Sequence, residues 1–595
     1  MKGVPARSSV PAAFAGIAEE LELLSMENTN RLLVNFSRIG KTAAYSGIAS
    51  AVFMASHANA QLLHNITMGN PKALGLANAV TADPPGIDSI HFNPAGLSKI
   101  QGRQYQLKLL VVDMQLESKF GQPTLPDDAT KQAYFDIRQD NTEDVDCTGA
   151  EATPDTCWGE DPVAGDTVTS GDPVLMLPFA GMVKLPILAV PTGGIAFEDS
   201  SRGWTFGTAV YSPEGVGYTR DADPNEAGSY QGYEVGVTRL TYFSPTIAIN
   251  VNDELAIGAG INFSYHGLGI NTLFRAPMTT TQFLGDLDTP QFDQILGLSV
   301  IGPYDWVSDL SLELEDFLSV GFNFGILWEP YDFLAFGFAY QSESTAHMKG
   351  DYKVVNSDEF YNTVLSLKGE SGGAGLPLDQ VLVALSGDSP FNGQKVEEGD
   401  VELDYIMPQN FAFGTSVRVL PNLKVNFDVK WIEYSVWDEL QFKFDGPVDY
   451  LTLASVVNNF AGFDNADSDE MRIPRNYEDV WSWAIGGEYQ LNDNMVLRAG
   501  YEPRESAIPE ESTDLLLPIG PADLYTVGFG LQLDRTARVE GAFGYLISET
   551  DTAACESNNA NGCRQGDVVY NPYYSVPFES TTTAYLFTLS YDKKF

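Results

Sequence analysis

Cations that alternate with apolar residues are the side chains of this sequence best suited to ligand chemistry. In the stretch that begins at Leu423, polar residues stand at every second position, so an extended strand would place them on one face. Arginine and lysine bind carboxylates with matched geometry where the surroundings have a low dielectric constant. The candidates for holding a ligand's carboxylate are Arg418, Lys424, Lys430 and Arg498. The alternative is that they form salt bridges with Glu488, Asp428 or Glu540 on neighbouring strands, and an alkane or aromatic ligand would need no cation.

Catalytic and metal-binding motifs are not found at recognisable spacings. The histidines outside residues 1–60, at positions 64, 91, 266 and 347, stand apart from any nucleophile and carboxylate that would complete a catalytic set. The acidic run at 464–470 offers the oxygen ligands that Ca²⁺ prefers, but it lacks the glycine and spacing of an EF-hand, which favours a solvated loop. We therefore expect no enzyme activity, no cofactor and no metal. A lipase-type barrel is the enzymatic alternative.

The charge of the chain excludes one class of partner. Its 595 residues include 80 acidic and 34 basic side chains, for a formal net charge of −46. Nucleic-acid binding needs clustered lysine and arginine, so no nucleic-acid partner is expected.

The N-terminal region has the pattern of a secretory signal. Basic residues (Arg31, Arg38 and Lys41) precede an apolar stretch at 43–55, and small residues stand just before Gln61. We expect residues 1–60 to be an upstream extension plus a cleavable signal peptide, with the true start codon left open. The four cysteines form two local pairs whose spacing does not suit zinc. In an oxidising compartment they predict the loop disulfides Cys147–Cys157 and Cys555–Cys563.

The rest of the chain has strand patterns and no apolar stretch long enough for a membrane helix. An exported protein of this kind is either soluble or an outer-membrane barrel. Segments of about ten residues alternate between large apolar and small or polar residues, aromatic residues stand near their ends, and short turns alternate with long connections. A lysine or arginine on the lipid face costs about 2–4 kcal/mol, so the polar faces must line a lumen. Only a closed barrel satisfies every strand amide within lipid.

Fourteen strands are expected, an even number as a single-chain barrel requires. They lie near 103–117, 191–198, 204–213, 240–250, 255–266, 318–328, 333–342, 403–419, 423–435, 480–491, 495–503, 523–533, 537–548 and 580–595. The boundaries between 118 and 200 stay open.

The segment at 73–100, "ALGLANAVTADPPGIDSIHFNPAGLSKI", resembles the N-terminal hatch of the OmpP1/FadL/TodX family of long-chain fatty acid transporters. The matching residues include Asp83, Asn93, Pro94, Ala95 and Gly96, while Pro84 replaces the second Asp of the family pattern. "WTFGTAVYSPEG" (204–215), "SPTIAINVNDELAIGAGINFSY" (244–265) and "DVWSWAIGGEYQLNDNMVLRAGYE" (479–502) follow in the family's order. The resemblance covers nearly all of 61–595.

This resemblance implies a β-barrel at 103–595, plugged by a hatch at 61–102, in the outer membrane of a Gram-negative bacterium. It implies passive uptake of long-chain fatty acids or other hydrophobic compounds, with release into the membrane at a kinked third strand. The residues expected to shape that lateral gate are Gly203, Pro213 and Gly215. The loops 267–317 and 343–402 would form a capture site, with short amphipathic helices bearing Phe292, Ile295, Leu296, Phe360, Tyr361, Val364 and Leu365; the alternative is that these residues only fold the loops.

Partners follow from the same resemblance. We expect a hydrophobic small molecule, the lipid and lipopolysaccharide of the outer membrane, and the barrel-assembly machinery, which would recognise the terminal Phe595. A monomer is expected. The functional alternatives are a surface adhesin or phage receptor and a general porin, and the sequence does not choose between fatty acid, alkane and aromatic substrates.

Overall fold

The computed structural model describes residues 65–124, 161–275, 301, 304–369, 390–461, 466–504, 506–563 and 571–595, all within the compact unit Asn59–Phe595. The expected signal peptide, the Cys147–Cys157 pair and the residues Phe292, Ile295 and Leu296 lie outside these ranges. Among the described helices, none is long and apolar enough to cross a membrane.

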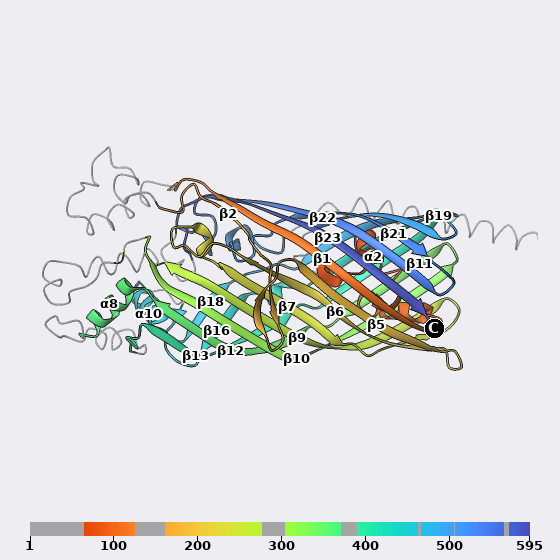
Figure 1. The fold of residues 1–595 in the computed structure, drawn as a ribbon, viewed down its shortest axis with the longest axis horizontal. Coiled ribbons are helices and arrows are strands. Elements are labelled where there is room, and N and C mark those ends of the chain that lie inside the picture. Colours follow the sequence, from red (N-terminus) through yellow and green to blue (C-terminus); the bar gives the residue numbers. More distant parts are fainter. Residues whose placement is uncertain are drawn as a thin grey trace, which may run out of the picture. The chain divides into compact units, whose positions relative to one another are not determined.

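The described strands form a closed antiparallel barrel (Figure 1). Nine positions in its wall are filled by single strands: β1 (Arg103–Phe120), β5 (Leu188–Asp199), β6 (Trp204–Thr219), β9 (Leu255–Arg275), β10 (Trp306–Tyr331), β20 (Met495–Arg504), β21 (Ala522–Gln532), β22 (Ala537–Thr552) and β23 (Phe578–Lys594). β1 pairs with β23 from Gln104↔Lys594 to Phe120↔Phe578, which closes the sheet on itself.

The other five wall positions are each filled by two strand segments in sequence. They are β7 (Glu234–Phe243) with β8 (Thr246–Asn250), β11 (Leu334–Gln341) with β12 (Ser344–Asn356), β13 (Val396–Met407) with β14 (Asn410–Leu420), β15 (Leu423–Ile432) with β16 (Glu439–Phe444), and β18 (Glu470–Pro474) with β19 (Val480–Asn492). Both members of a pair bond to the same neighbouring positions; β7 and β8, for example, both pair with β6 and with β9. The wall therefore has fourteen strands, as the sequence predicts.

Alternation of exposure shows which face meets lipid. On β10 the side chains of Leu318, Phe322 and Trp328 are exposed, whereas those of Ser319 and Asn323 between them are buried. Aliphatic and aromatic side chains are exposed on the outer face of β23 in the same way. An exposed apolar face around a polar interior is the arrangement of a membrane barrel.

The wall continues further than the sequence pattern indicated. Residues 267–275 and 306–316, expected in a loop, extend the β9–β10 ladder, and 344–356 pairs with 396–407 as β12 and β13. In β12 the exposed residues are polar or charged (His347, Lys349, Asp351 and Lys353), while Met348 and Val354 are buried inside. The sequence reading failed here because it looked for an apolar outer face. β10, at 26 residues and about 3.3 Å per residue, is far longer than an apolar band about 25 Å tall requires. The outward residues of its first half are polar: Asp309, Ser311, Glu313 and Glu315.

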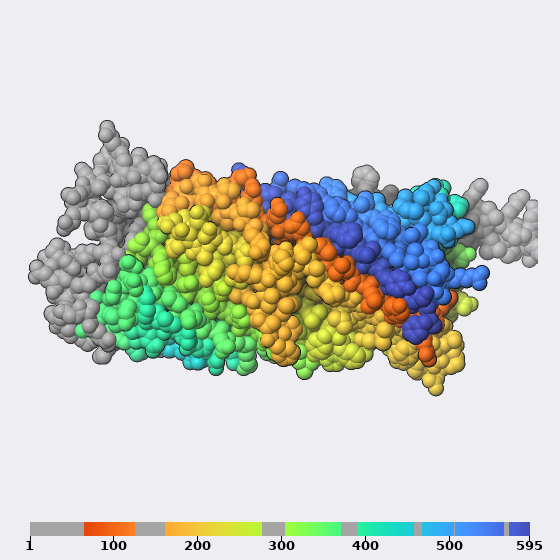
Figure 2. Space-filling model, viewed as in Figure 1, coloured from red at the N-terminus to blue at the C-terminus, as the bar shows by residue number. Residues whose placement is uncertain are grey.

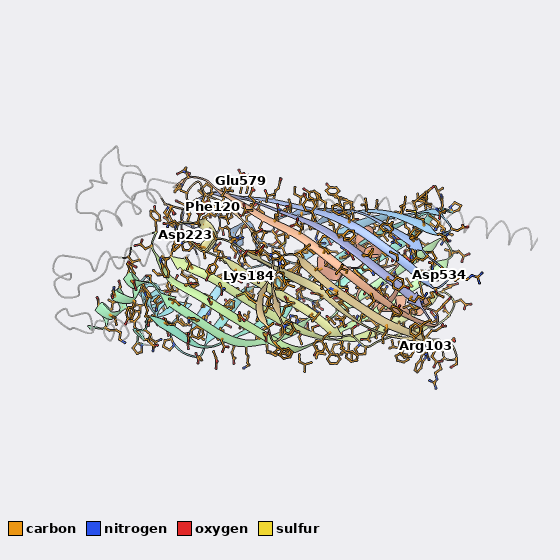
Figure 3. All side chains as sticks on the ribbon, viewed as in Figure 1. Arg103, Phe120, Lys184, Asp223, Asp534 and Glu579 are labelled. Atoms are coloured by element: carbon orange, nitrogen blue, oxygen red, sulfur yellow. A yellow bond between two sulfur atoms is a disulfide. The ribbon has the colours of Figure 1, made fainter. Side chains whose placement is uncertain are left out.

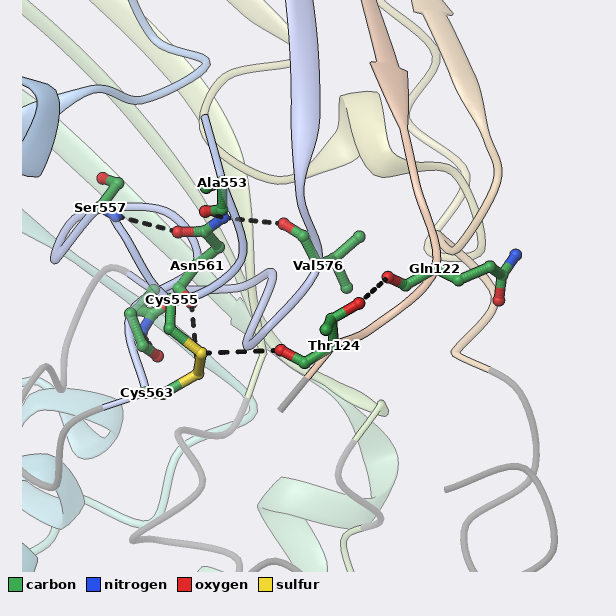
Figure 4. The surroundings of a disulfide bond; sticks show 10 residues. Gln122, Thr124, Ala553, Cys555, Ser557, Asn561, Cys563 and Val576 are labelled. Atoms are coloured by element: carbon green, nitrogen blue, oxygen red, sulfur yellow. Dashed lines mark hydrogen bonds between the residues drawn. A yellow bond between two sulfur atoms is a disulfide. The ribbon is translucent and has the colours of Figure 1, made fainter. Parts of the chain in front are cut away.

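The long connections fold at the end of the barrel opposite the C-terminus. The predicted amphipathic helix is confirmed as α8 (Asp358–Leu367), which belongs to one apolar cluster with the helix α10 (Asp449–Ala461). The predicted Cys555–Cys563 disulfide is also confirmed. Beside it, Asn561 donates to the carbonyls of Ala553 and Val576, and Cys555 Sγ lies 3.9 Å from the carbonyl oxygen of Thr124 (Figure 4).

From Asn65 onward, where the described part of the chain begins, five short helices precede the first strand: η1 (Ile66–Met68), α2 (Pro71–Gly75), η2 (Gly86–Asp88), α3 (Ser89–Phe92) and η3 (Pro94–Lys99). Their apolar side chains form a cluster with inward-facing Ala196, Ala209 and Ala248 of the wall. Most of this segment is irregular backbone between very short helices, and non-helical backbone is tolerated at membrane depth only when protein or water surrounds it. The segment 65–100, called the hatch below, therefore plugs the lumen.

Wall glycines make room for the hatch. A Cβ atom at Gly325 would lie 2.0 Å from Asn93 Oδ1, one at Gly258 2.3 Å from the carbonyl carbon of Pro94, and one at Gly337 2.0 Å from the carbonyl oxygen of Thr81. Three adjacent strands thus present no side chain where the backbone of the hatch lies against them.

Candidate functional site

The hatch is tied to the wall by the side chain of Asn93, which is fully buried. Asn93 Nδ2 donates to the carbonyl of Thr81 at 2.7 Å and to the carbonyl of Ile326 on β10 at 3.0 Å. Its Oδ1 accepts from the backbone N–H of Ala95 at 3.2 Å and caps η3. One amide therefore joins two parts of the hatch to the barrel.

Buried ion pairs hold another edge of the hatch. Asp83 lies 2.9 Å from Lys72 of the hatch and forms a short ion pair with Lys424 of β15, which also lies 3.0 Å from Glu488. Burial alone would raise the pKa of Asp83, but Lys424 and Lys72 hold it well below its usual range. The carboxylate thus stays charged, and removing one partner of such a buried pair typically costs about 3–5 kcal/mol.

Two further contacts of this kind join the hatch to other strands. Lys108 of β1 bonds to Asp88 at 2.8 Å, and the same carboxylate accepts from Asn70 at 2.6 Å. Asn78 donates to Glu502 of β20 at 3.1 Å, and Glu502 pairs with Lys430 at 3.2 Å. His91 of the hatch packs against Tyr211 of β6. Burial lowers the pKa of His91 to about 3, so its imidazole is neutral there.

These contacts account for the cations that the sequence singled out. Arg498 bonds to Glu488 at 2.7 Å and to Glu540 at 2.8 Å, as the salt-bridge alternative proposed, and Lys424 also pairs with Glu488. Lys430 pairs with Glu502, not with Asp428. Arg418 is exposed at the end of β14. Three of the four cations therefore already have carboxylate partners in the structure.

A mostly apolar cavity lies in the lumen among β6, β7, β9, β12, β13 and β16, with a volume of about 130 Å³. Its lining includes Val216, Tyr218, Val237, Leu268, Ile270, Met348, Tyr405, Trp437, Leu440 and Tyr477. Cavities lined by apolar and aromatic groups with a few polar ones are typical of small-molecule sites. The sequence analysis did not identify this cavity, because its residues come from segments up to about 260 positions apart.

One polar row borders the cavity. Glu214, Arg239 and His266 are direct register partners on the adjacent strands β6, β7 and β9. The guanidinium of Arg239 lies 3.8 Å from Glu214, which is an ion pair but longer than a hydrogen bond, and its buried Nε has no partner among the described residues. His266 is 2% exposed, and its Nε2 likewise has no hydrogen-bond partner there. Buried donors without partners are costly, so this row can accept a polar group of a ligand.

The strand β6, which carries Glu214 of this row, has interrupted pairing with its neighbours. β6 pairs with β5 only from Trp204 to Val210, and its pairing with β7 shifts register between Tyr211 and Glu214. The predicted gate strand thus kinks at Pro213 but does not end there, and Gly215 pairs normally with Thr238. Gly203 lies in the tight turn before β6 with a φ of +68°. The carbonyl of Ser212 at the kink accepts from Thr67 of the hatch at 2.9 Å.

A second cavity passes through the wall at this kink. It touches Ile66 and Thr67 of the hatch, both inward and outward residues of β1 (Val112 and Asp113), and Pro186 outside. We call it the window. It shares Gly215, Val216 and Tyr218 with the lumen cavity, so β6 separates the two spaces.

The family model for outer membrane transport proteins of the OMPP1/FadL/TodX type matches residues 49–595. The chain belongs to this family. It is therefore a transport channel of the outer membrane and not an enzyme, and members of the family move hydrophobic compounds. No curated protein matches the chain.

Solved structures agree on the fold. A Pseudomonas aeruginosa FadL homologue is similar with a TM-score of 0.59 at 17% identity, covering 89% of this chain and 99% of that one. The Pseudomonas putida toluene transporter TodX gives a TM-score of 0.51 at 15% identity, with coverages of 89% and 99%. The Ralstonia pickettii toluene transporter TbuX gives 0.50 at 15%, also with 89% and 99%. At these identities the likeness concerns the fold alone.

The residues expected to capture ligand outside the membrane are only partly accessible. Phe360 and Val364 are buried in the cluster that α8 shares with α10, whereas Tyr361 and Leu365 are half-buried. Their role in capture stays a prediction.

We predict that Asn93→Ala opens the barrel to small polar solutes. The change removes three hydrogen bonds and leaves the buried carbonyl of Thr81 and the backbone N–H of Ala95 without this partner, at roughly 1–3 kcal/mol for each unsatisfied group. The wall itself should remain folded, because its ladders do not involve Asn93. Proteoliposome swelling with a small sugar measures the leak. Asn362→Ala, on the exposed side of α8, is the control and should swell as the wild type does; the same slow rate for both variants would contradict the role of Asn93.

Proposed function

We propose that this protein takes up long-chain fatty acids, or amphiphiles like them with one polar head, and releases them sideways into the membrane. The observation that carries the proposal is the lumen cavity, which is separated from the window by β6. Its lining is mostly apolar; the polar groups are the row Glu214–Arg239–His266, Thr238, and Arg475, which forms an ion pair with Asp514. An apolar chain gains about 0.8 kcal/mol for each CH₂ group that it buries. A single polar head would find its partners in the row.

Arg239 suits a carboxylate better than do the cations near the hatch. Its guanidinium pairs with one carboxylate, that of Glu214, at 3.8 Å. Lys424, Lys430 and Arg498 each have a carboxylate partner at a closer distance. A ligand carboxylate would compete with Glu214 for the guanidinium, so the charge of Glu214 limits the affinity. The window supports sideways release, because a ligand that passes β6 there meets lipid without crossing the ion pairs of the hatch.

Other expectations follow from the proposal. Tyr361 and Leu365 would contribute to capture at the outer end. Phe595, which is 72% exposed and whose ring centroid lies 6.1 Å from that of Tyr105, would be the signal for barrel assembly. We expect a monomer embedded in the lipid and lipopolysaccharide of the outer membrane.

Monoaromatic hydrocarbons are the second candidate substrates, because aromatic side chains such as Tyr405, Trp437 and Tyr477 line the cavity. Two of the similar structures are toluene transporters. A hydrocarbon would make no use of Arg239, which allows an experiment to separate the two candidates.

We predict opposite effects on fatty acid binding from Glu214→Gln alone and from Glu214→Gln combined with Arg239→Met. The single variant removes the competing carboxylate and should bind oleate at least as tightly as the wild type. The double variant also removes the guanidinium without leaving a buried carboxylate unpaired, and it should bind oleate about 10- to 100-fold more weakly, because a hydrogen bond to a charged group contributes about 1.5–3 kcal/mol. Equilibrium binding to purified protein measures both. Toluene, or an alkane of matched length, should bind all three proteins equally; equal oleate affinity in all three would reject Arg239 as the anchor.

We predict that deleting Pro213 blocks uptake. Between Tyr211 and Glu214, β6 has one residue more than β7 has between Thr241 and Arg239, so removing one residue restores the ladder and narrows the window. Oleate uptake into cells that lack other routes should fall more than tenfold, while equilibrium binding is kept. Pro213→Ala retains the extra residue and should transport normally. Undiminished uptake by the deletion variant would argue against sideways release.

A further inference from the structure

A hairpin lies on the outside of the barrel beside the window. Its strands β3 (Val174–Leu177) and β4 (Gly181–Lys184) form a separate two-stranded sheet, with Val174 opposite Lys184 and Leu177 opposite Gly181. In the part of the chain that the structure describes, neither strand joins a ladder of the wall. In Figure 2 the orange hairpin lies across the outer surface of the yellow and green strands, and Lys184 at its end is labelled in Figure 3.

The wall has a track of glycines under the hairpin. A Cβ at Gly217 of β6 would lie 2.1 Å from the carbonyl oxygen of Val174, and one at Gly236 of β7 3.2 Å from the side chain of Val174. At Gly269 of β9, the three nearest atoms all belong to Met182, at 2.4, 2.4 and 3.3 Å. Three neighbouring strands therefore lack side chains where the hairpin rests, so its backbone lies directly on the wall.

Strand β3 of the hairpin is buried. Val174, Leu175 and Met176 are each 7% exposed or less, and Leu175 belongs to the same apolar cluster as Ile66, Leu110 and Val112.

The polar contacts of the hairpin lie at its edges. Lys184 Nζ is 3.2 Å from Glu234, and the backbone N–H of Met182 is 3.5 Å from Glu313. Phe179 at the tip is 90% exposed and stacks on Phe317 at 4.7 Å. The charged partners and the aromatic tip place the hairpin where the apolar band meets the polar zone. It can leave the wall without breaking any strand ladder.

The base of the hairpin frames the window. Ser170 bonds to Leu116 of β1, and Gly171 bonds to Thr219 of β6, so this end bridges the gap and is fixed. Beyond it, the two arms are joined by one hydrogen bond from Leu185 to Pro173, and Pro173, Pro186 and Ile187 line the window from outside. Proline has no N–H, so two donors that would otherwise lack partners at this mouth are absent.

We propose that this hairpin is the outer gate of the window and that Pro173, Pro186 and Ile187 form the last binding subsite for the apolar chain of a departing ligand. This inference rests on the proposed sideways release. With the hairpin on the glycine track, the arms cover the mouth of the window. When the hairpin lifts, the fixed bridge at Ser170 and Gly171 acts as its hinge, and the chain passes between β1 and β6 into lipid.

A reversible cross-link tests the gate. Met182→Cys combined with Gly269→Cys places two thiols where only Met182 atoms now stand, so a disulfide would fasten the hairpin to β9. Oxidised protein should bind oleate within twofold of the wild type but take it up at least tenfold more slowly, and reductant should restore uptake. The wild type under the same oxidising and reducing conditions controls for the Cys555–Cys563 bond, and each single-cysteine variant controls for the substitutions.

A wedge gives an independent test that needs no disulfide. Gly269→Leu would push the hairpin off its track and should raise the uptake rate, whereas a passive cover would leave that rate unchanged. Normal uptake by the cross-linked protein would overturn the gate. If uptake also survives deletion of Pro213, sideways release itself is wrong; if that deletion blocks uptake but the cross-link does not, only the gate is wrong.

Discussion

The structure depends on one constraint: a backbone amide or carbonyl that faces hydrocarbon must find its partner within the protein. The ladders of fourteen closed strands meet most of this constraint, but a gap opens at the kink of β6, where pairing with β5 stops at Val210. There the hatch supplies Thr67 as the partner of the Ser212 carbonyl, and the backbone of Gly171 bonds to Thr219. The break in the wall is thus filled by groups that are not part of the sheet. Such groups can move without unravelling the barrel, which makes this break suitable for passage.

Ion pairing in the lumen distinguishes the charged side chains that hold the hatch in place from those that could bind a ligand. Where the hatch meets β1, β15 and β20, each lysine has a carboxylate within about 3 Å, and these pairs resist displacement because an unpaired charge would remain buried. At the cavity, the described residues give Arg239 the distant carboxylate of Glu214 and leave Nε2 of His266 without a hydrogen-bond partner. The hatch therefore closes the direct route through the barrel, whereas the polar row at β6 keeps the capacity to bind. Sideways movement then requires the fewest buried ion pairs to break.

Much of the fold could be predicted from the sequence, because alternation of apolar and polar residues with a period of two indicates a strand with two different faces. Each predicted strand in the membrane part corresponds to a strand of the wall, and the Asn93–Gly96 segment lies in the lumen, where the family resemblance implied. The upper wall was not predicted, since β12 and β13 face water outside and apolar residues inside, the reverse of the expected pattern. The cavity was not predicted because alternation shows which residues face inward but not which distant strands complete a site. His266 ended the predicted strand 255–266 and Arg239 stood just before the predicted strand 240–250, yet only their register with Glu214 makes them a row. The hairpin at 174–184 had no signal that distinguished it from a loop.

The path of the ligand can be observed directly with oleate that carries a photoreactive diazirine near its methyl end. After brief illumination of the protein in outer-membrane vesicles, peptide mass spectrometry would locate the adducts. We expect adducts on the cavity lining and on Ile66, Val112 and Ile187 around the window. Few adducts should form on the side of the hatch that faces the end of the barrel with the short turns. Adducts that run through the hatch past Lys72 and Asp83, with none at the window, would contradict sideways release.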